Sequence, residues 1–284
     1  MTRIGKEELR ALVDFDVEGD KVRAVVSQAA ADASKTLLFL ARYASWNGVF
    51  GSGVASLAGK IGRSRALFIE RGLPSPIADR SVLVASYFFD AARDEFDDRD
   101  TEHRDTHRCL AQAALAGMLA WAVKSGRPEL AAPGAVEETL GADPSWLSHL
   151  RHRAALGYGN GWPDDRESIF RAIGYHLGSE VLADQEFSVI DTELRKRAPE
   201  MVAFLEQHEV EIAGQKHQAY YWIRIHSGHG GGAEADHFDW AVRGAHLAFD
   251  YTPPELHDAL RDHVYEGYRA FAQDHQRFFT SVLS

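Results

Sequence analysis

A strongly charged stretch inside an apolar helical pattern constrains the fold of this chain more than any other feature. Residues 81–124 repeat apolar side chains at helical spacing, but residues 93–107 within them hold seven acids and two histidines. Runs of charge usually form a solvated helix face. Here both flanks are apolar, so the charged centre belongs to a helix whose ends are buried. Because a buried charge is costly unless it is paired or binds a metal, the pattern indicates a metal site.

A second candidate ligand lies within the helical pattern of residues 165–197. Glu180 stands between Leu177 and Val181, where an unpaired carboxylate costs several kcal/mol on burial. The alternatives are that it points outward or pairs with an arginine. His176 lies one turn earlier. We expect it to be a buried histidine with satisfied hydrogen bonds, although it is also placed to support Glu180.

The third candidate segment joins an aromatic helix that ends at His226 to a helical pattern that begins at Glu234. Glu234 and His237 are three residues apart and are therefore neighbours on one helix face. An acid and a histidine at this spacing recur in di-iron and di-manganese bundles. The alternative is a flexible glycine-rich loop whose histidines are incidental. Three C-terminal histidines lack surrounding acids and are expected at the surface: His257, His263 and His275.

The rest of the chain favours an all-α fold. Helical periodicity recurs over residues 21–46, 54–61, 199–208, 217–226 and 234–249, and no alternation typical of a strand extends beyond a few residues. Residues 126–144 are rich in Gly and Pro and are expected to be loops. Thr252-Pro-Pro-Glu255 predicts a capped start for the last helix. No shift in composition divides the chain, so residues 1–284 are predicted to form a single helical-bundle domain.

Charge and composition exclude several classes of protein. The formal net charge is −11, and the chain lacks the basic stripe that phosphate binding needs, so we expect no nucleic-acid partner. No apolar run reaches the roughly 18–20 residues that span a bilayer, and charges interrupt the N-terminus where a leader would be apolar. The single cysteine, Cys109, excludes an intramolecular disulfide. We expect a cytoplasmic protein without membrane contact.

The order of the three segments resembles the heme-oxygenase-like di-iron oxidases, iron enzymes on the helical bundle shared by heme oxygenases and thiaminases. The resemblance covers residues 80–250. It rests on Asp94-Glu95 with His107-Arg-Cys-Leu, on Gly174-Tyr-His-Leu-Gly-Ser-Glu180, and on Tyr220-Tyr-Trp-Ile-Arg-Ile-His226 with the pair that follows. It implies a heme-oxygenase-like helical bundle and six ligands for two iron ions: Glu95, His107, Glu180, His226, Glu234 and His237.

Two spacings depart from that family. Residues 227–233 separate His226 from Glu234, so either this helix is interrupted, or His229 replaces His226, or Asp236 is the acid. The first acid and its histidine are also further apart than in the family, and they reach one centre only with a bend or bulge in the helix. Other ligands from that stretch remain open: Asp98, Asp100 and His103.

By this resemblance the protein is an O2-dependent oxidoreductase that oxidises a small molecule in specialised metabolism, by N-oxygenation, desaturation or oxidative C–C cleavage. Manganese accepts the same ligands as iron. The sequence leaves open the substrate, a homodimer and an external electron donor. The alternatives are a metal-free enzyme of this fold, with Cys109 as its one thiol, or a small-molecule binding protein. A heme oxygenase would need a histidine near the N-terminus, but the first is His103.

Overall fold

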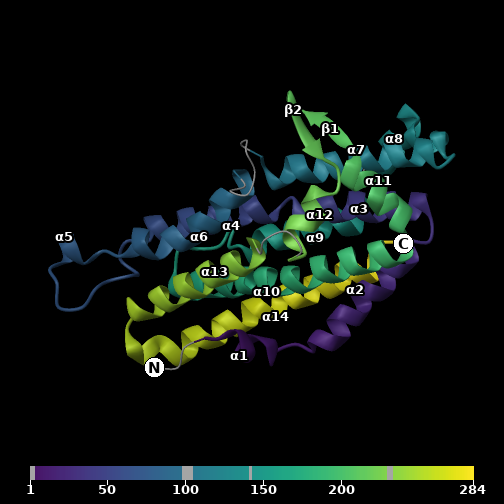
Figure 1. Ribbon diagram of the computed structural model, residues 1–284. Coiled ribbons are helices and arrows are strands. Elements are labelled where there is room, and N and C mark those ends of the chain that lie inside the picture. Colours follow the sequence, from purple (N-terminus) through teal and green to yellow (C-terminus); the bar gives the residue numbers. More distant parts are fainter. Residues whose placement is uncertain (1–3, 98–104, 141–142, 229–232) are drawn as a thin grey trace.

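The computed structural model describes residues 4–97, 105–140, 143–228 and 233–284. It is a bundle of α-helices with one small hairpin (Figure 1), which confirms the predicted all-α class. The long helices are α2 (Phe15–Ala29), α3 (Ala33–Asn47), α4 (Phe50–Arg63), α6 (Ser81–Phe96), α7 (His107–Lys124), α9 (Ser145–Gly157), α10 (Arg166–Arg197), α13 (Ala233–Asp250) and α14 (His257–Ser281). The short elements are α1 (Lys6–Arg10), α5 (Ser75–Ala78), η1 (Pro128–Ala131), α8 (Pro133–Leu140), α11 (Pro199–Gln207), β1 (Glu209–Ile212), β2 (Gln215–Gln218), α12 (Tyr221–His226) and η2 (Pro254–Leu256).

Helix α10 runs through the middle of the bundle and lies alongside α14 (Figure 1). Two glycines allow this close approach. A Cβ atom at Gly174 would lie 1.9 Å from the carbonyl oxygen of Val264, and one at Gly267 would lie 1.9 Å from that of Arg171. Because no side chain fits so close to a backbone oxygen, larger residues there would push the two helices apart. α10 also contacts α2, α4, α12 and α13, so its side chains reach the interior from several directions.

One connected cluster of buried apolar side chains extends from Ile4 to Val282. Many of its largest members are aromatic, and burial of each such side chain stabilises the fold by about 1.5–3 kcal/mol. Trp46, Tyr43 and Phe187 belong to this group, and each has less than 2 % of its surface exposed. Any acid or histidine in such surroundings needs a partner, because water cannot compensate for its charge or polarity.

Two helices predicted from the sequence are each divided in the structure. The pattern over residues 21–46 falls into α2 and α3, because Asp32 accepts hydrogen bonds from the first turn of α3. The pattern over residues 81–124 falls into α6 and α7. There Thr106 caps α7 by accepting a hydrogen bond from the backbone of Cys109 at 3.0 Å. The described residues on either side of positions 98–104 thus end one helix at Phe96 and begin another at His107, so α6 and α7 are separate helices.

The predicted helix over residues 217–226 begins only at Tyr221, because a β-hairpin precedes it. β1 and β2 pair antiparallel across Ala213 and Gly214, whose φ angles are 54° and 81°. Positive φ at both turn residues matches the twist of a two-residue hairpin loop. The strands have four residues each, which is too short for a clear alternation in sequence. None of the described helices is long and apolar enough to cross a membrane.

Three further expectations were wrong: a helix cap, a loop region and the exposure of one histidine. Thr252 does not cap the last helix, since its hydroxyl donates to the carbonyl of Phe249 at 3.0 Å and the short helix η2 precedes α14. The region predicted as loop over residues 126–144 contains η1 and α8. His275, expected at the surface, is only 1 % exposed, whereas His257 and His263 are half-buried.

Candidate metal centre

Five of the six predicted ligands have described side chains, and the structure brings them together from five helices. They are Glu95 on α6, His107 on α7, Glu180 on α10, His226 on α12 and His237 on α13. The sixth, Glu234, lies in the first turn of α13, but its side chain is outside the described part of the chain, as is that of Asp236. Four further alternatives lie outside the described residues: Asp98, Asp100, His103 and His229.

Helix breaks place the first acid and its two histidines together. α6 ends one residue after Glu95, α7 begins at His107, and α12 ends at His226. His107 Nδ1 lies 3.1 Å from Glu95 Oε2 and 3.3 Å from His226 Nε2. α12 therefore ends before α13 begins, and the first acid–histidine pair spans two helices instead of one. The choice of His229 or Asp236 as a ligand stays open, because their side chains lie outside the described part of the chain.

The orientation of His226 suits a metal ligand. Its Nδ1 lies 2.7 Å from the carbonyl oxygen of Trp222, so Nδ1–H donates and Nε2 keeps its lone pair. That Nε2 faces His107 Nδ1. Metal-binding histidines commonly donate their other ring N–H to a backbone carbonyl, which fixes the ring and its tautomer. The ring of Phe187 stacks on His226 at 4.5 Å between centroids and closes the other side.

A second group of acid and histidine adjoins the first and is centred on Glu180. His237 Nε2 lies 2.8 Å from Asp94 Oδ2, and its Nδ1 lies 3.6 Å from Glu180 Oε2. The other carboxylate oxygen of Glu180 lies 3.2 Å from Nδ1 of His176. The rings of His237 and His107 are 6.2 Å apart between centroids, which links the two groups. Glu180 thus points inward to two histidines, and no arginine among the described residues pairs with it.

His176 departs from its expected role as a satisfied core histidine. It is fully buried, and only its Nδ1 is paired, with Glu180. Its Nε2 is buried without a hydrogen-bond partner among the described residues. A buried polar nitrogen left in this way costs about 1–3 kcal/mol, a cost that proteins retain mainly at functional sites.

Burial and neighbouring charges set the protonation of the site. Burial, followed by the neighbouring His107, lowers the pKa of His226 to about 3. Burial likewise lowers the pKa of His176. Burial alone would raise the pKa of Glu95, but the surrounding imidazoles, His107 first, lower it to about 2. At neutral pH these two imidazoles are thus uncharged and this carboxylate is ionised, which are the forms that bind metal ions.

Asp94 is a member of the site that residue-by-residue analysis of the sequence did not select. It is 3 % exposed and bonds to His237, whereas the sequence argument chose its neighbour Glu95. A signal was present, because Asp94 follows the apolar Ala91 by three residues and so shares its buried helix face. Both acids enter the site because the last turn of α6 is surrounded by other helices.

The donor atoms fit iron by their chemistry. Imidazole nitrogen and carboxylate oxygen from several helices are the ligands that iron takes in helical bundles. Among the described residues, no three His, Cys, Asp or Glu side chains already lie in the arrangement that holds a metal ion. They are paired with one another instead, as His107 is with Glu95 and His237 with Asp94. Metal binding would replace these pairs.

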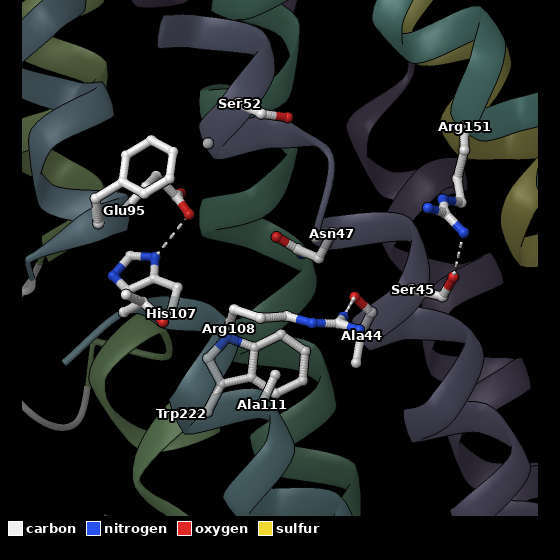
Figure 2. Close-up of a pocket in the computed structure, with 14 residues that line it drawn as sticks. Ala44, Ser45, Asn47, Ser52, Glu95, His107, Arg108, Ala111, Arg151 and Trp222 are labelled. Carbon is white, nitrogen blue, oxygen red and sulfur yellow. Dashed lines mark hydrogen bonds and ion pairs between the residues drawn. The ribbon is translucent and has the colours of Figure 1, made fainter. Parts of the chain in front are cut away.

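A cavity of about 470 Å³ opens beside this cluster, bordered by α3, α4, α6, α7, α9 and α12. Figure 2 shows Glu95 and His107 on one side of it and Ser45 and Arg151 on the other. Gly51 in the wall is required for space, because a Cβ there would lie 2.8 Å from Cβ of Glu95. The cavity therefore leads to the cluster, and its size suits a small molecule.

Comparison of the chain with protein-family models, with curated proteins and with solved structures gives no match. The resemblance to heme-oxygenase-like di-iron oxidases therefore stays a prediction from the sequence.

Proposed function

We propose that the protein is a non-heme di-iron oxidoreductase that uses O2 to oxidise a small molecule on a heme-oxygenase-like bundle. One observation carries this proposal. Acids and histidines from five helices are buried in two adjoining groups beside a cavity. Each group contains both carboxylate and imidazole, as expected for a pair of irons in a bundle.

The two groups suggest how the ligands divide. Glu95, His107 and His226 would hold one iron, while Asp94, Glu180 and His237 would hold the other. Glu234, at the start of α13, remains a candidate for a further ligand. Such a pair of irons would supply electrons for the reduction of O2. Manganese is the other metal that this donor set accepts.

The protein's own residues would prepare the site and protect it. The carbonyl of Trp222 fixes the tautomer of His226, and the ring of Phe187 covers that imidazole. A substrate that fills the cavity beside the cluster would exclude water, which strengthens electrostatic interactions inside it. The cavity next to Glu95 and His107 would hold the substrate against the reacting centre.

Metal content tests the proposal. Anaerobically purified protein loaded with Fe(II) is expected to hold about two irons per chain, as in other bundles of this kind, and to change its absorbance on exposure to O2. Glu180→Ala and His237→Ala should each lose bound iron while circular dichroism reports an unchanged helical content. His149→Ala on α9 is the matched control, because His149 is exposed. Full iron occupancy in both ligand variants would contradict the ligand set.

The cavity also supports the alternative of a small-molecule binding protein without metal. It gives no support to a thiol enzyme, because Cys109 is not among the residues that line it. Absence of specific Fe(II) and Mn(II) binding by the wild-type protein would favour the binding protein over the oxidoreductase.

A further inference from the structure

The polar lining of the cavity beside Glu95 consists largely of hydrogen-bond donors. Arg108 is exposed and donates to the carbonyl of Ala44 at 3.0 Å, and no described acid forms an ion pair with it. Nδ2 of Asn47 is buried and has no acceptor among the described residues. Nε of Arg151 is likewise buried without an acceptor among the described residues, although its Nη1 pairs with Asp143. A ligand that satisfies the remaining N–H groups of the exposed Arg108 must carry acceptor oxygens.

The backbone is shaped to admit the guanidinium of Arg108. A Cβ at Gly48, between α3 and α4, would lie 3.1 Å from Nη1 of Arg108 and 3.0 Å from the carbonyl oxygen of Ala44. Figure 2 shows the Arg108 side chain extending toward Ala44, with Asn47 on one side and Trp222 on the other. The bond to Ala44 uses one N–H and leaves others of the planar fork for a carboxylate.

Charge separates the two ends of the cavity. Among the described residues that line it, Glu95 is the one acid, and it is paired with His107. The cations are Arg108 and Arg151, and the charge of Arg151 is compensated by Asp143. An anionic group is therefore attracted to Arg108 and repelled by Glu95, which orients a ligand that carries one anion and an apolar body.

We propose that the cavity binds a small organic acid, with its carboxylate on the guanidinium of Arg108 and the amide of Asn47. Its apolar body lies between Ala44, Ala111 and Trp222, so that atoms remote from the carboxylate face Glu95 and His107. The identity of the reaction rests on the proposed oxidoreductase function, whereas binding of the acid needs no iron. Arg108 is accordingly a specificity-determining residue for acids over amines and alcohols.

Calorimetric titration of the metal-free protein tests the site with three probes of one shape: 3-phenylpropanoate, 3-phenylpropylamine and 3-phenylpropanol. The acid is expected to bind more tightly than the amine and the alcohol. Arg108→Gln should weaken acid binding by about 10-fold or more, since a charge-assisted bidentate contact is lost, and Arg108→Lys should restore part of it. Asn47→Asp should also weaken binding by repulsion. Arg63→Gln is the control, because Arg63 is exposed on α4 and pairs with Asp164 away from the cavity.

Saturation-transfer NMR with the same probes extends the test to weak binding. Absence of transfer to the acid, tighter binding of the amine, or unchanged acid affinity in a folded Arg108→Gln variant would each overturn the proposal. Iron content is measured in the same samples. If the acid binds but wild-type protein takes up no iron, the acid site stands and the oxidoreductase proposal fails. If iron binds but the acid does not, the oxidoreductase proposal stands and the acid-site proposal fails.

Discussion

Two clusters of acids and histidines lie along the same helix, α10, and they differ in how their histidines are paired and protonated. The metal-candidate cluster consists of Asp94, Glu95, His107, Glu180, His226 and His237. The clamp cluster consists of Glu18, Tyr43, Glu186 and His275. In the clamp cluster, His275 lies between two carboxylates, with Nε2 2.9 Å from Glu186 and Nδ1 3.4 Å from Glu18. The hydroxyl of Tyr43 donates to the other oxygen of Glu186 at 2.7 Å.

The protonation of the two clusters differs in direction. Burial lowers the pKa of His275, but the two flanking carboxylates outweigh it and raise this pKa overall. Burial raises the pKa of Glu18, but His275 and neighbouring donors lower it overall. In the metal-candidate cluster, by contrast, the pKa of His226 falls to about 3. An imidazole between two carboxylates supplies the cation for that cluster, whereas the buried imidazole of His226 stays neutral, which is the form that binds a metal ion.

The largest expected effect is on the clamp cluster. His275→Ala leaves Glu18 and Glu186 buried without the cation between them, and removal of one partner from a buried ion pair costs about 3–5 kcal/mol. Urea unfolding at neutral pH should show this loss in the free energy of unfolding. His149→Ala at the surface serves as the control. A loss below about 1 kcal/mol, as for an exposed ion pair, would mean that the clamp cluster contributes little to the fold.

The sequence contains a partial signal for the burial of His275, which was expected at the surface. Phe271 and Phe278 lie four residues before and three residues after it, so the three share the apolar face of α14. Its acids, Glu18 and Glu186, come from α2 and α10, and no local spacing connects them to it. A histidine on an apolar stripe is therefore recognisable as buried, but its partner is a matter of tertiary structure.

The burial of Glu180, by contrast, was predictable from its neighbours in the sequence. It lies within one continuous helix whose apolar neighbours mark it as buried, and only its partners were unknown. The relation between Glu95 and His107 was harder, because it depends on the break between α6 and α7. Thr106 is a suitable N-cap residue and marks where α7 begins. The all-α class followed from helical periodicity, whereas the hairpin before α12 is too short to produce a pattern.

A matched pair of substitutions on α10 tests the difference between the two clusters. The expected change in the free energy of unfolding is smaller than for His275→Ala. Glu186→Gln removes a charge that His275 needs and should lower the free energy of unfolding by about 1–3 kcal/mol. Glu180→Gln in the metal-free protein removes one of three neighbouring acids, so we expect stability to be unchanged or raised, as is common when a functional site is neutralised. Equal losses in urea unfolding would contradict the distinction between the clusters.

The smallest expected effect is a difference in pH dependence. Because the folded pKa of His275 is above its ordinary value of 6.5, its contribution is fully present below pH 6.5 and is lost as pH rises through the folded pKa. The folded pKa of Glu18 is below its ordinary value of 4.5, so its contribution is present above pH 4.5 and is lost as pH falls through the folded pKa. The clamp cluster should therefore stabilise the fold most between these two values.

Urea unfolding of the metal-free protein across this range measures the effect. The groups that face His275 are Glu18 and Glu186, with Tyr43 bonded to Glu186 and Lys21 paired with Glu18. Wild-type protein should lose stability relative to His275→Gln as pH rises above 6.5, because only the wild type releases a proton from this site. Two parallel stability curves would show that His275 does not titrate there. His275 would then be a neutral imidazole whose single N–H donates to only one of the two carboxylates, and the contrast with His226 would be lost.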